Sequence, residues 1–179
     1  MSKLKDHKKK LSQAESEAFD LVKKFVKKPK TLKPFDFQPG QIIMYSYNAK
    51  DKKSPYDATP MAMILGRNKK HTLALNWHWI PPSVRKNLMK IILRRNKQNI
   101  KNNKPLDFSY QGLLKLLVKT GAPALRKYIN KRISIKGVVI PHEYYLKVVE
   151  LRGEHFMGIS SSDAWKMSVT KINKRRGKK

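Results

Sequence analysis

An excess of positive charge is the feature that most limits what this chain can fold into. Its 179 residues carry 41 Lys and Arg against 12 Asp and Glu, a formal net charge of +29. Like charges repel one another in a compact state, and a polyanion such as nucleic acid or an acidic lipid surface relieves that repulsion. An apolar fraction of 40% still allows a folded core. Nucleic acid is therefore the expected partner, with a merely Lys-rich protein as the alternative.

Several residue types that enzymes and metal sites use are missing. The chain has no cysteine, which excludes disulfides and thiolate zinc sites. It also has no glycine-rich phosphate loop and no paired-histidine metal motif, so we expect no cofactor and no metal. The longest apolar runs fall far short of the ~18 residues of a membrane-spanning helix, and no apolar stretch follows the basic N-terminus. The sequence predicts no membrane span and no secretory signal.

The charges divide the chain into three parts. Residues 1–34 combine eleven lysines with helical spacing of apolar residues over 12–27, which predicts a basic amphipathic N-terminal helix and a linker. Residues 35–170 are expected to form a single domain. Residues 171–179 contain no acid and predict a basic flexible tail.

Within the central part, strand-like and helix-like patterns alternate. We predict strands over 41–47, 61–66 and 71–80, with residues 48–60 as a long loop and a hairpin around 66–70. Helices are predicted over 83–99, from 107 or 109 to 121, and after Pro123. Strands over 133–140 and 145–151 and a last helix capped by Ser161 or Ser162 follow. This order indicates an α+β fold, built on a small, strongly bent sheet or an SH3-like barrel with helices packed outside.

Basic side chains on the helix over 83–99 are the first candidates for contact with phosphates. Its apolar residues would form a buried face and leave the basic ones in solvent. Arginine binds phosphate oxygens in a bidentate manner, whereas no pattern typical of base reading occurs. The candidates are Arg85, Lys86, Lys90, Arg94, Arg95 and Lys97.

Further candidates lie in the loop, the hairpin and the tail. Tyr45 and Tyr47 share one face of a predicted strand and precede a lysine-rich loop that begins with Lys50. Exposed, these rings would stack on single-stranded nucleic acid; covered by a helix, they would belong to the core. The other predicted contacts are Lys52, Lys53, Arg67, Lys69, Lys70, Lys174, Arg175 and Arg176.

The sequence leaves the roles of Asp57 and His78 open. Asp57 is expected to form an Asx turn or a strand-end cap, with a carboxylate metal site as the alternative. His78 lies between Trp77 and Trp79 on a predicted strand and therefore faces away from both. The pattern favours buried tryptophans; exposed ones would be platforms for base stacking.

A series of aromatic and proline motifs lies between residues 39 and 93. It comprises Pro39-Gly40, Tyr45-Ser46-Tyr47, Tyr56-Asp57 and Asn76-Trp77-His78-Trp79-Ile80-Pro81-Pro82. In this order the motifs resemble those of a family of small basic proteins from large tailed phages, in which Tyr-x-Tyr-x-Pro-Lys, Tyr-Tyr-Asp-x-Phe-Pro and Asn-x-His-Tyr-Leu-Pro-Pro segments succeed one another. The chain departs from that pattern at Ala49, at Ser54-Pro55 and at Trp79. The resemblance implies a phage protein connected with DNA ends or with the virion.

These observations favour a non-enzymatic phage protein that binds DNA or RNA through phosphates, largely without sequence preference, in the infected host cytoplasm or the virion. The alternative is a structural virion component, such as a neck, baseplate or internal head protein, whose basic face docks on an acidic partner protein. A weaker alternative is a small metal-dependent nuclease that uses Asp57 or the carboxylates of Glu143, Glu150 and Glu154. Charge and aromatic content fit DNA and RNA, single and double strands alike.

Overall fold

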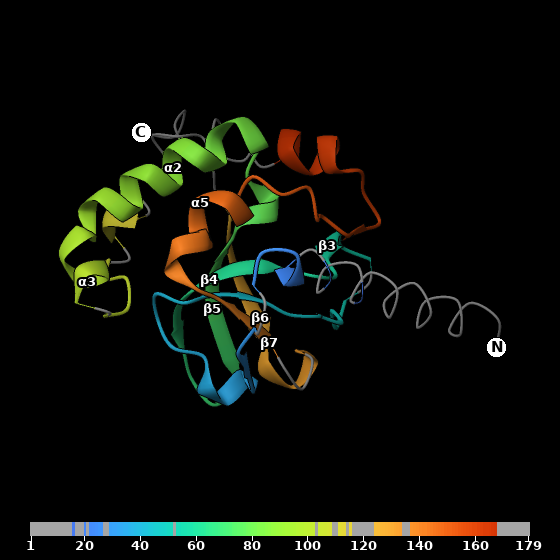
Figure 1. Ribbon diagram of the computed structural model, residues 1–179. Helices are drawn as coiled ribbons and strands as arrows, with labels where there is room; N and C mark the ends of the chain where they lie inside the picture. The colour runs from blue at the N-terminus through green and yellow to red at the C-terminus, as the bar shows by residue number, and fades with distance from the viewer. Residues whose placement is uncertain are drawn as a thin grey trace.

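The computed structural model has a mixed α+β architecture, in which helices lie against an antiparallel sheet (Figure 1). It describes residues 16, 20, 22–26, 29–51, 53–102, 104–108, 111–113, 115, 124–133 and 137–167. The strands are β1 (Thr31–Leu32), β2 (Ile42–Met44), β3 (Tyr56–Asp57), β4 (Met61–Arg67), β5 (His71–Asn76), β6 (Leu125–Ile129), β7 (Gly137–Ile140) and β8 (Phe156–Met157). Six of them form one sheet in the order β1-β7-β2-β4-β5-β6, and β3 pairs with β8. The predicted fold class is confirmed.

Helices cover one side of this sheet. The α-helices are α2 (Pro82–Arg95), α3 (Lys97–Lys101) and α5 (Tyr145–Val148), and short 3-10 turns are η1 (Pro34–Asp36), η2 (Trp77–Trp79), η3 (Asn130–Arg132) and η4 (His142–Tyr144). Figure 1 shows α2 and α3 following one another along one side of the molecule, with α5 between α2 and the sheet. Among the described helices, none is long and apolar enough to cross a membrane.

Both faces of the central strands are buried, which explains why they read as nearly continuous apolar runs. Ile42 and Met44 point into a core shared with the helices. Ile43 and Tyr45, which alternate with them, point into a second core on the other face. This second core is rich in tyrosine and alanine.

The sheet is bent but open, so the SH3-like barrel expected as one form of the fold is not formed. The bend brings the chain beyond β2 against the chain beyond β6, where Tyr47 bridges to Ile133 and Asn48 N donates to Arg132 O over 3.0 Å. The sheet does not close, because β7 and β1 continue it beyond β2 and leave β1 and β6 as its two edges.

The hairpin predicted around residues 66–70 is confirmed as the β4–β5 pair. Its turn is closed by Asn68, whose Oδ1 accepts hydrogen bonds from Lys70 N (2.9 Å) and His71 N (2.8 Å). The pairing register shifts between Ile64 and Gly66, so the strands carry an irregularity next to the turn. Local side-chain chemistry thus determines this turn.

Three element predictions are wrong. Residues 125–129, expected as a helix after Pro123, form strand β6, because they pair along the edge of β5 from His71↔Ile129 to Leu75↔Leu125. Residues 145–151, expected as a strand, contain α5; Tyr145 and Val148 of the helix and Val149 just after it are buried at helical spacing. The strand predicted over 71–80 ends at Asn76, and η2 follows it. Residues 48–60 also contain the short strand β3.

The helix predictions hold more closely. The helix expected over 83–99 corresponds to α2 and α3, with Asn96 between them. Residues 161–167 are helical, but Ser160 caps them by accepting a hydrogen bond from Asp163 N (3.1 Å). Of the helix predicted over 12–27, Val22 and Val26 are buried in the core as its apolar face requires. Most of that segment and of residues 109–123 lies outside the described residues.

Candidate nucleic-acid interface

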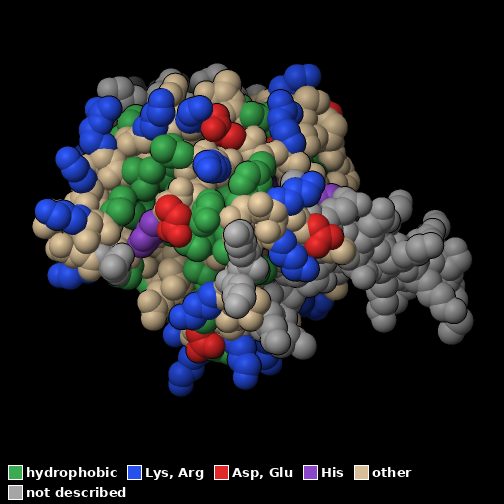
Figure 2. Space-filling model, viewed as in Figure 1, with side chains coloured by type: hydrophobic (Ala, Val, Ile, Leu, Met, Phe, Trp, Pro, Cys, Tyr) green, Lys and Arg blue, Asp and Glu red, His purple; other side chains and the backbone are tan. Residues whose placement is uncertain are grey.

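Four predicted phosphate contacts lie exposed on the α2–α3 surface, which we define as Lys90, Arg94, Arg95 and Lys97. None of the four forms an ion pair with a carboxylate of the described chain. Figure 2 shows basic side chains along the margin of the molecule where α2 and α3 run. Lys86 is half exposed, and its Nζ lies 3.0 Å from Oε1 of Glu150. The predicted basic helix face is therefore present from Lys90 onward.

Arg85 was predicted on this exposed face, and that prediction is wrong because its side chain is 0% exposed. The guanidinium forms a salt bridge with Glu154. It also donates to the carbonyl oxygens of Ile80 (2.7 Å), Leu151 (3.1 Å) and His78 (3.2 Å). All of its neighbours are protein groups, so Arg85 fastens the start of α2 to the chain after α5.

The helical spacing of Arg85 contained the signal for its burial. Leu88, Met89 and Ile92 are buried, and they follow Arg85 at three, four and seven positions. Arg85 thus lies on the apolar face of the helix. The charge of Arg85 favours solvent exposure, whereas its position on the helix favours burial.

The two tyrosines predicted as stacking platforms are covered. Tyr45 is fully buried and Tyr47 nearly so. Each ring packs against other aromatic rings, and both contact Tyr128. The centroid of Tyr45 lies 5.7 Å from that of Phe37 and 5.4 Å from that of Tyr128. The centroid of Tyr47 lies 4.9 Å from that of Tyr128 and 6.4 Å from that of Tyr56. The covering groups are aromatic side chains of the bent sheet rather than a helix. The core alternative is correct for Tyr45, whereas Tyr47 also borders a hollow described below.

Asp57 forms the Asx turn that the sequence predicts, since its Oδ1 accepts a hydrogen bond from Thr59 N at 3.1 Å. Its side chain is 1% exposed, and its Oδ2 lies 2.8 Å from His78 Nδ1 and 2.8 Å from Asn76 Nδ2. Asn76 Nδ2 also donates to the Tyr128 hydroxyl at 2.9 Å. Both carboxylate oxygens of Asp57 are therefore engaged by protein groups. In the described part of the chain, no three His, Asp or Glu side chains converge as metal ligands.

Trp77 and Trp79 are buried, as favoured from the sequence. The reason differs from the expected one: Trp77, His78 and Trp79 form the turn η2, and all three are buried, because a 3-10 turn does not alternate its side chains between two faces. The ring of Trp79 has two partners. Phe156 meets it edge-on at 4.8 Å between centroids, and the guanidinium carbon of Arg126 lies 4.0 Å from the ring centre.

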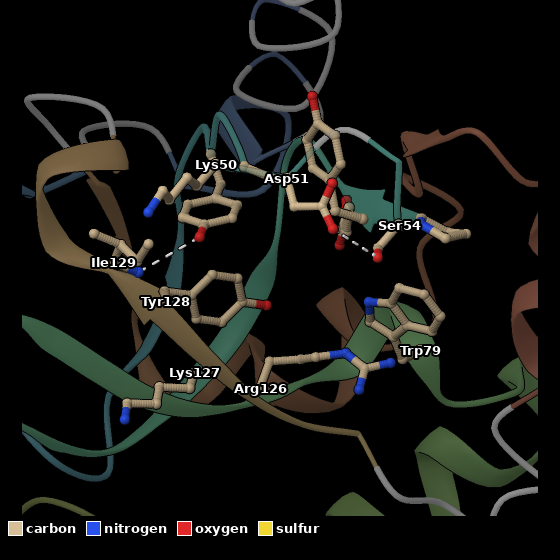
Figure 3. Close-up of a pocket in the computed structure, with 13 residues that line it drawn as sticks. Lys50, Asp51, Ser54, Trp79, Arg126, Lys127, Tyr128 and Ile129 are labelled. Atoms are coloured by element: carbon tan, nitrogen blue, oxygen red, sulfur yellow. Dashed lines mark hydrogen bonds between the residues drawn. The ribbon is translucent and has the colours of Figure 1, made fainter.

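A hollow of about 300 Å³ opens beside Arg126, between β6 and the chain that joins β2 to β3 (Figure 3). The guanidinium of Arg126 forms no hydrogen bond and no ion pair with any described residue. Its burial lowers the pKa of the guanidinium from the usual range, with nearby Tyr128 and Asp57 opposing this shift. The lining residues are Tyr47, Ala49, Lys50, Asp51, Ser54, Pro55, Tyr56, Asp57, Trp79, Arg126, Lys127, Tyr128 and Ile129.

Sequence reasoning missed Arg126 and Lys127, because residues 125–129 were assigned to a helix. Read as a strand, the same residues alternate, and Arg126 and Tyr128 share one side. Two adjacent cations on an edge strand would have indicated a binding site. Recognising that edge strand requires knowing that β6 pairs with β5, and residue spacing alone does not reveal this pairing.

A second group of cations, the strand-edge band, lies next to the hollow. Asn130 joins its parts, because Asn130 N donates to Lys70 O (3.0 Å) and Asn130 Nδ2 to Asn68 O (2.8 Å), which places η3 against the β4–β5 turn. The members are exposed, and none pairs with a described carboxylate. The band consists of Arg67, Lys69, Lys70, Lys127, Lys131 and Arg132.

The remaining predicted contacts divide between the described and undescribed residues. Lys50 and Lys53 are exposed in the loop that borders the hollow, where Asp51 accepts hydrogen bonds from Lys53 N (2.9 Å) and Ser54 Oγ (3.1 Å). Lys52, Lys174, Arg175 and Arg176 lie outside the described residues.

Comparison with known protein families gives a match. A family model described as "Phage T4 terminal DNA protecting protein" matches residues 2–173, nearly the whole chain. No curated protein and no solved structure matches. The predicted resemblance to a phage protein family is confirmed.

Proposed function

The chain belongs to the family of the phage T4 terminal DNA protecting protein, and on that premise we propose that it binds the ends of linear phage DNA and shields them. Binding runs through phosphates, largely without reading the base sequence. It takes place during genome handling in the infected host cytoplasm or in the virion. The proposal contains no catalytic step.

The observation that supports this function best is the strand-edge band. Its six cations come from the β4–β5 turn, from β6 and from η3, yet they lie together because Asn130 ties η3 to the turn. None of these cations has a carboxylate partner in the described chain, and apart from Arg67 Nε, which donates to Phe37 O over 2.9 Å, their donors remain available for phosphate oxygens. Each phosphate that a cation neutralises releases condensed counterions, which supplies affinity at low salt.

The α2–α3 surface supports the same function as a second set of phosphate contacts. Arg94, Arg95 and Lys97 succeed one another closely at the end of α2 and the start of α3, and all are exposed. No asparagine or glutamine flanked by small residues is displayed there, so the surface favours backbone contact over base reading.

The direct test measures binding of the full chain to DNA with and without ends. A linear duplex and a closed circle of the same sequence are titrated across a salt series with magnesium present, and the linear duplex is then exposed to an exonuclease. We expect tighter binding to the linear form, a steep loss of affinity with salt and protection of the ends from digestion. Equal affinity for circle and linear duplex, or digestion at the unprotected rate, would refute end binding.

Two double variants test the strand-edge band. Lys69→Gln with Lys131→Gln removes two charges from the band, whereas Lys33→Gln with Lys147→Gln removes two exposed charges near β1 and on α5. The first pair of substitutions should weaken binding to all DNA and reduce the slope of log affinity against log salt concentration by about two units. The second pair should change the affinity and this slope much less. If the protein itself cleaved the DNA and the Asp57→Asn variant did not, the protein would be a nuclease and the proposed function would be wrong.

A further inference from the structure

Arg126 has a position that a purely structural arginine would not have. It is half buried in the wall of the hollow, and its guanidinium forms no hydrogen bond with any residue that the structure describes. An arginine stays charged in proteins, and removing its donors from water without replacing their hydrogen bonds is unfavourable. An anion placed in the hollow would restore those bonds.

The surroundings of Arg126 hold its planar group in place before any ligand arrives. The guanidinium stacks over Trp79 at 4.0 Å, and Trp79 is in turn fixed by Phe156. The contact with the Trp79 ring involves no hydrogen bond, so the N–H donors along the edge of the guanidinium stay open where the group borders the hollow (Figure 3). That edge matches two oxygens of a phosphate group, and little conformational freedom is lost on binding.

One further donor points into the same space, and two cations border it. Figure 3 shows the Tyr128 hydroxyl directed toward the middle of the hollow and Lys50 and Lys127 on the side away from Trp79. Burial raises the pKa of Tyr128 well above its usual range, so its hydroxyl remains protonated. A neutral hydroxyl thus accompanies the guanidinium within the hollow, and the side chains of two lysines lie at its border.

The size and the walls of the hollow fit one nucleotide better than a continuous duplex. Its volume of about 300 Å³ lies at the lower end of the range of small-ligand pockets. Ala49, Pro55 and Tyr56 give it an apolar wall, suited to a sugar and the flat face of a base. The strand-edge band continues outside the hollow through Lys127, so a strand that ends in the hollow has cations along its next phosphates.

Two carboxylates also line the hollow and oppose an anion there. Asp57 is paired with His78 and receives two further hydrogen bonds. Asp51 is exposed and engaged by Lys53 N and Ser54 Oγ. The cations Lys50, Arg126 and Lys127 outnumber them, and a terminal phosphate, with about −1.5 to −2 charges, gains more from this balance than an internal phosphate with one.

We propose that the hollow beside β6 receives the terminal nucleotide of a DNA strand and that Arg126 binds its terminal phosphate. The inference rests on the proposed function, since it assigns the place where the end is held. It adds that the protein distinguishes a phosphorylated end from a hydroxyl end.

The test compares three DNAs of one sequence: a linear duplex with 5′-phosphates, the same duplex with 5′-hydroxyls, and a closed circle. We expect the full chain to bind the phosphorylated duplex about tenfold more tightly than the hydroxyl duplex, the ratio that one charge-assisted hydrogen bond provides. Arg126→Met keeps the packing over Trp79 but removes the charge and the donors. It should bind the two linear duplexes equally and the circle as the unaltered protein does.

Arg152→Met is the matched control. Arg152 also lies over a tryptophan ring, 5.3 Å from the centre of Trp165, but it is exposed and does not line the hollow. This variant should keep the full preference for phosphorylated ends. Arg126→Lys keeps the charge and should retain part of the preference, which preserves the test if the methionine variant does not fold.

The two proposals fail in different ways. Equal binding of the phosphorylated and hydroxyl duplexes by the unaltered protein, or a preference that survives in Arg126→Met, would overturn the terminal-phosphate site. If both linear duplexes were still preferred over the circle, end binding itself would stand. Equal binding of all three DNAs would refute the proposed function.

Discussion

Arg85 on α2 and Arg126 on β6 are both withdrawn from solvent, and each lies near a tryptophan ring, but their donors meet opposite surroundings. Arg85 pairs with Glu154 and donates to three backbone carbonyl oxygens. The guanidinium of Arg126 lies over Trp79 and has no hydrogen-bond partner among the described residues. Burial lowers the pKa of both arginines, and for Arg85 the Glu154 carboxylate opposes that shift.

The difference separates structural from binding arginines in a chain that is full of positive charge. An arginine whose donors are filled by the protein stabilises the fold and is unavailable to a ligand. An arginine that is held rigidly with its donors open is prepared for an anion. Charge alone does not distinguish the two, whereas their hydrogen-bond partners do.

The largest expected effect is the loss of stability on Arg85→Ala. It leaves Glu154 and three carbonyl groups without their donor, so we expect the free energy of unfolding to fall by about 3–5 kcal/mol. Arg126→Ala removes only a stacked cation and its packing, which costs at most about 2 kcal/mol. Urea unfolding of both variants measures the contrast. Equal losses would mean that Arg126 is as structural as Arg85.

The next effect concerns affinity and distinguishes the α2–α3 surface from the hollow. Replacing Arg94, Arg95 and Lys97 by alanine should weaken binding to every DNA by a similar factor, and the salt slope should flatten by about one unit per lost phosphate contact. The preference for phosphorylated ends should persist, because Arg126 is untouched. Titrations of linear and circular DNA at several salt concentrations measure both quantities. An unchanged slope would remove this surface from the interface.

A smaller effect of opposite sign is expected at the mouth of the hollow. Asp51→Asn removes an exposed negative charge that opposes a phosphate, yet its Oδ1 can still accept the hydrogen bond from Lys53 N. Affinity for phosphorylated ends should rise about threefold at low salt and less at high salt. Asp36→Asn, exposed on η1 and outside the hollow, is the control. A similar gain in both variants would indicate a general charge effect rather than a local one.

The smallest effect is expected for Lys86→Ala, one residue after Arg85. The Lys86 and Glu150 side chains are 48% and 45% exposed, so solvent screens their ion pair. We expect the free energy of unfolding to change by less than about 1 kcal/mol. Comparing this variant with Arg85→Ala shows whether burial, rather than charge, decides how much an ion pair of α2 contributes to the free energy of unfolding. A loss as large as that of Arg85→Ala would contradict the contrast.

The sequence was most informative where structure depends on near neighbours. The β4–β5 turn is determined by Asn68, the Asx turn by Asp57 with Thr59, and the start of α2 by its prolines. These contacts span two or three residues, so spacing and residue type suffice. The exposed cations of the α2–α3 surface followed from the helical pattern for the same reason.

By itself, the sequence determined the excess of positive charge, the α+β class and the positions of these local turns and of α2, because each depends on composition or on residues close along the chain. Only the tertiary structure decided which arginines are open to a ligand. Arg85 finds Leu151 and Glu154 at separations of 66 and 69 residues, and Arg126 meets Trp79 only because β6 pairs with β5. Whether the donors of a buried arginine find protein partners depends on groups that the fold brings from distant segments. Local spacing along the chain does not specify those long-range contacts.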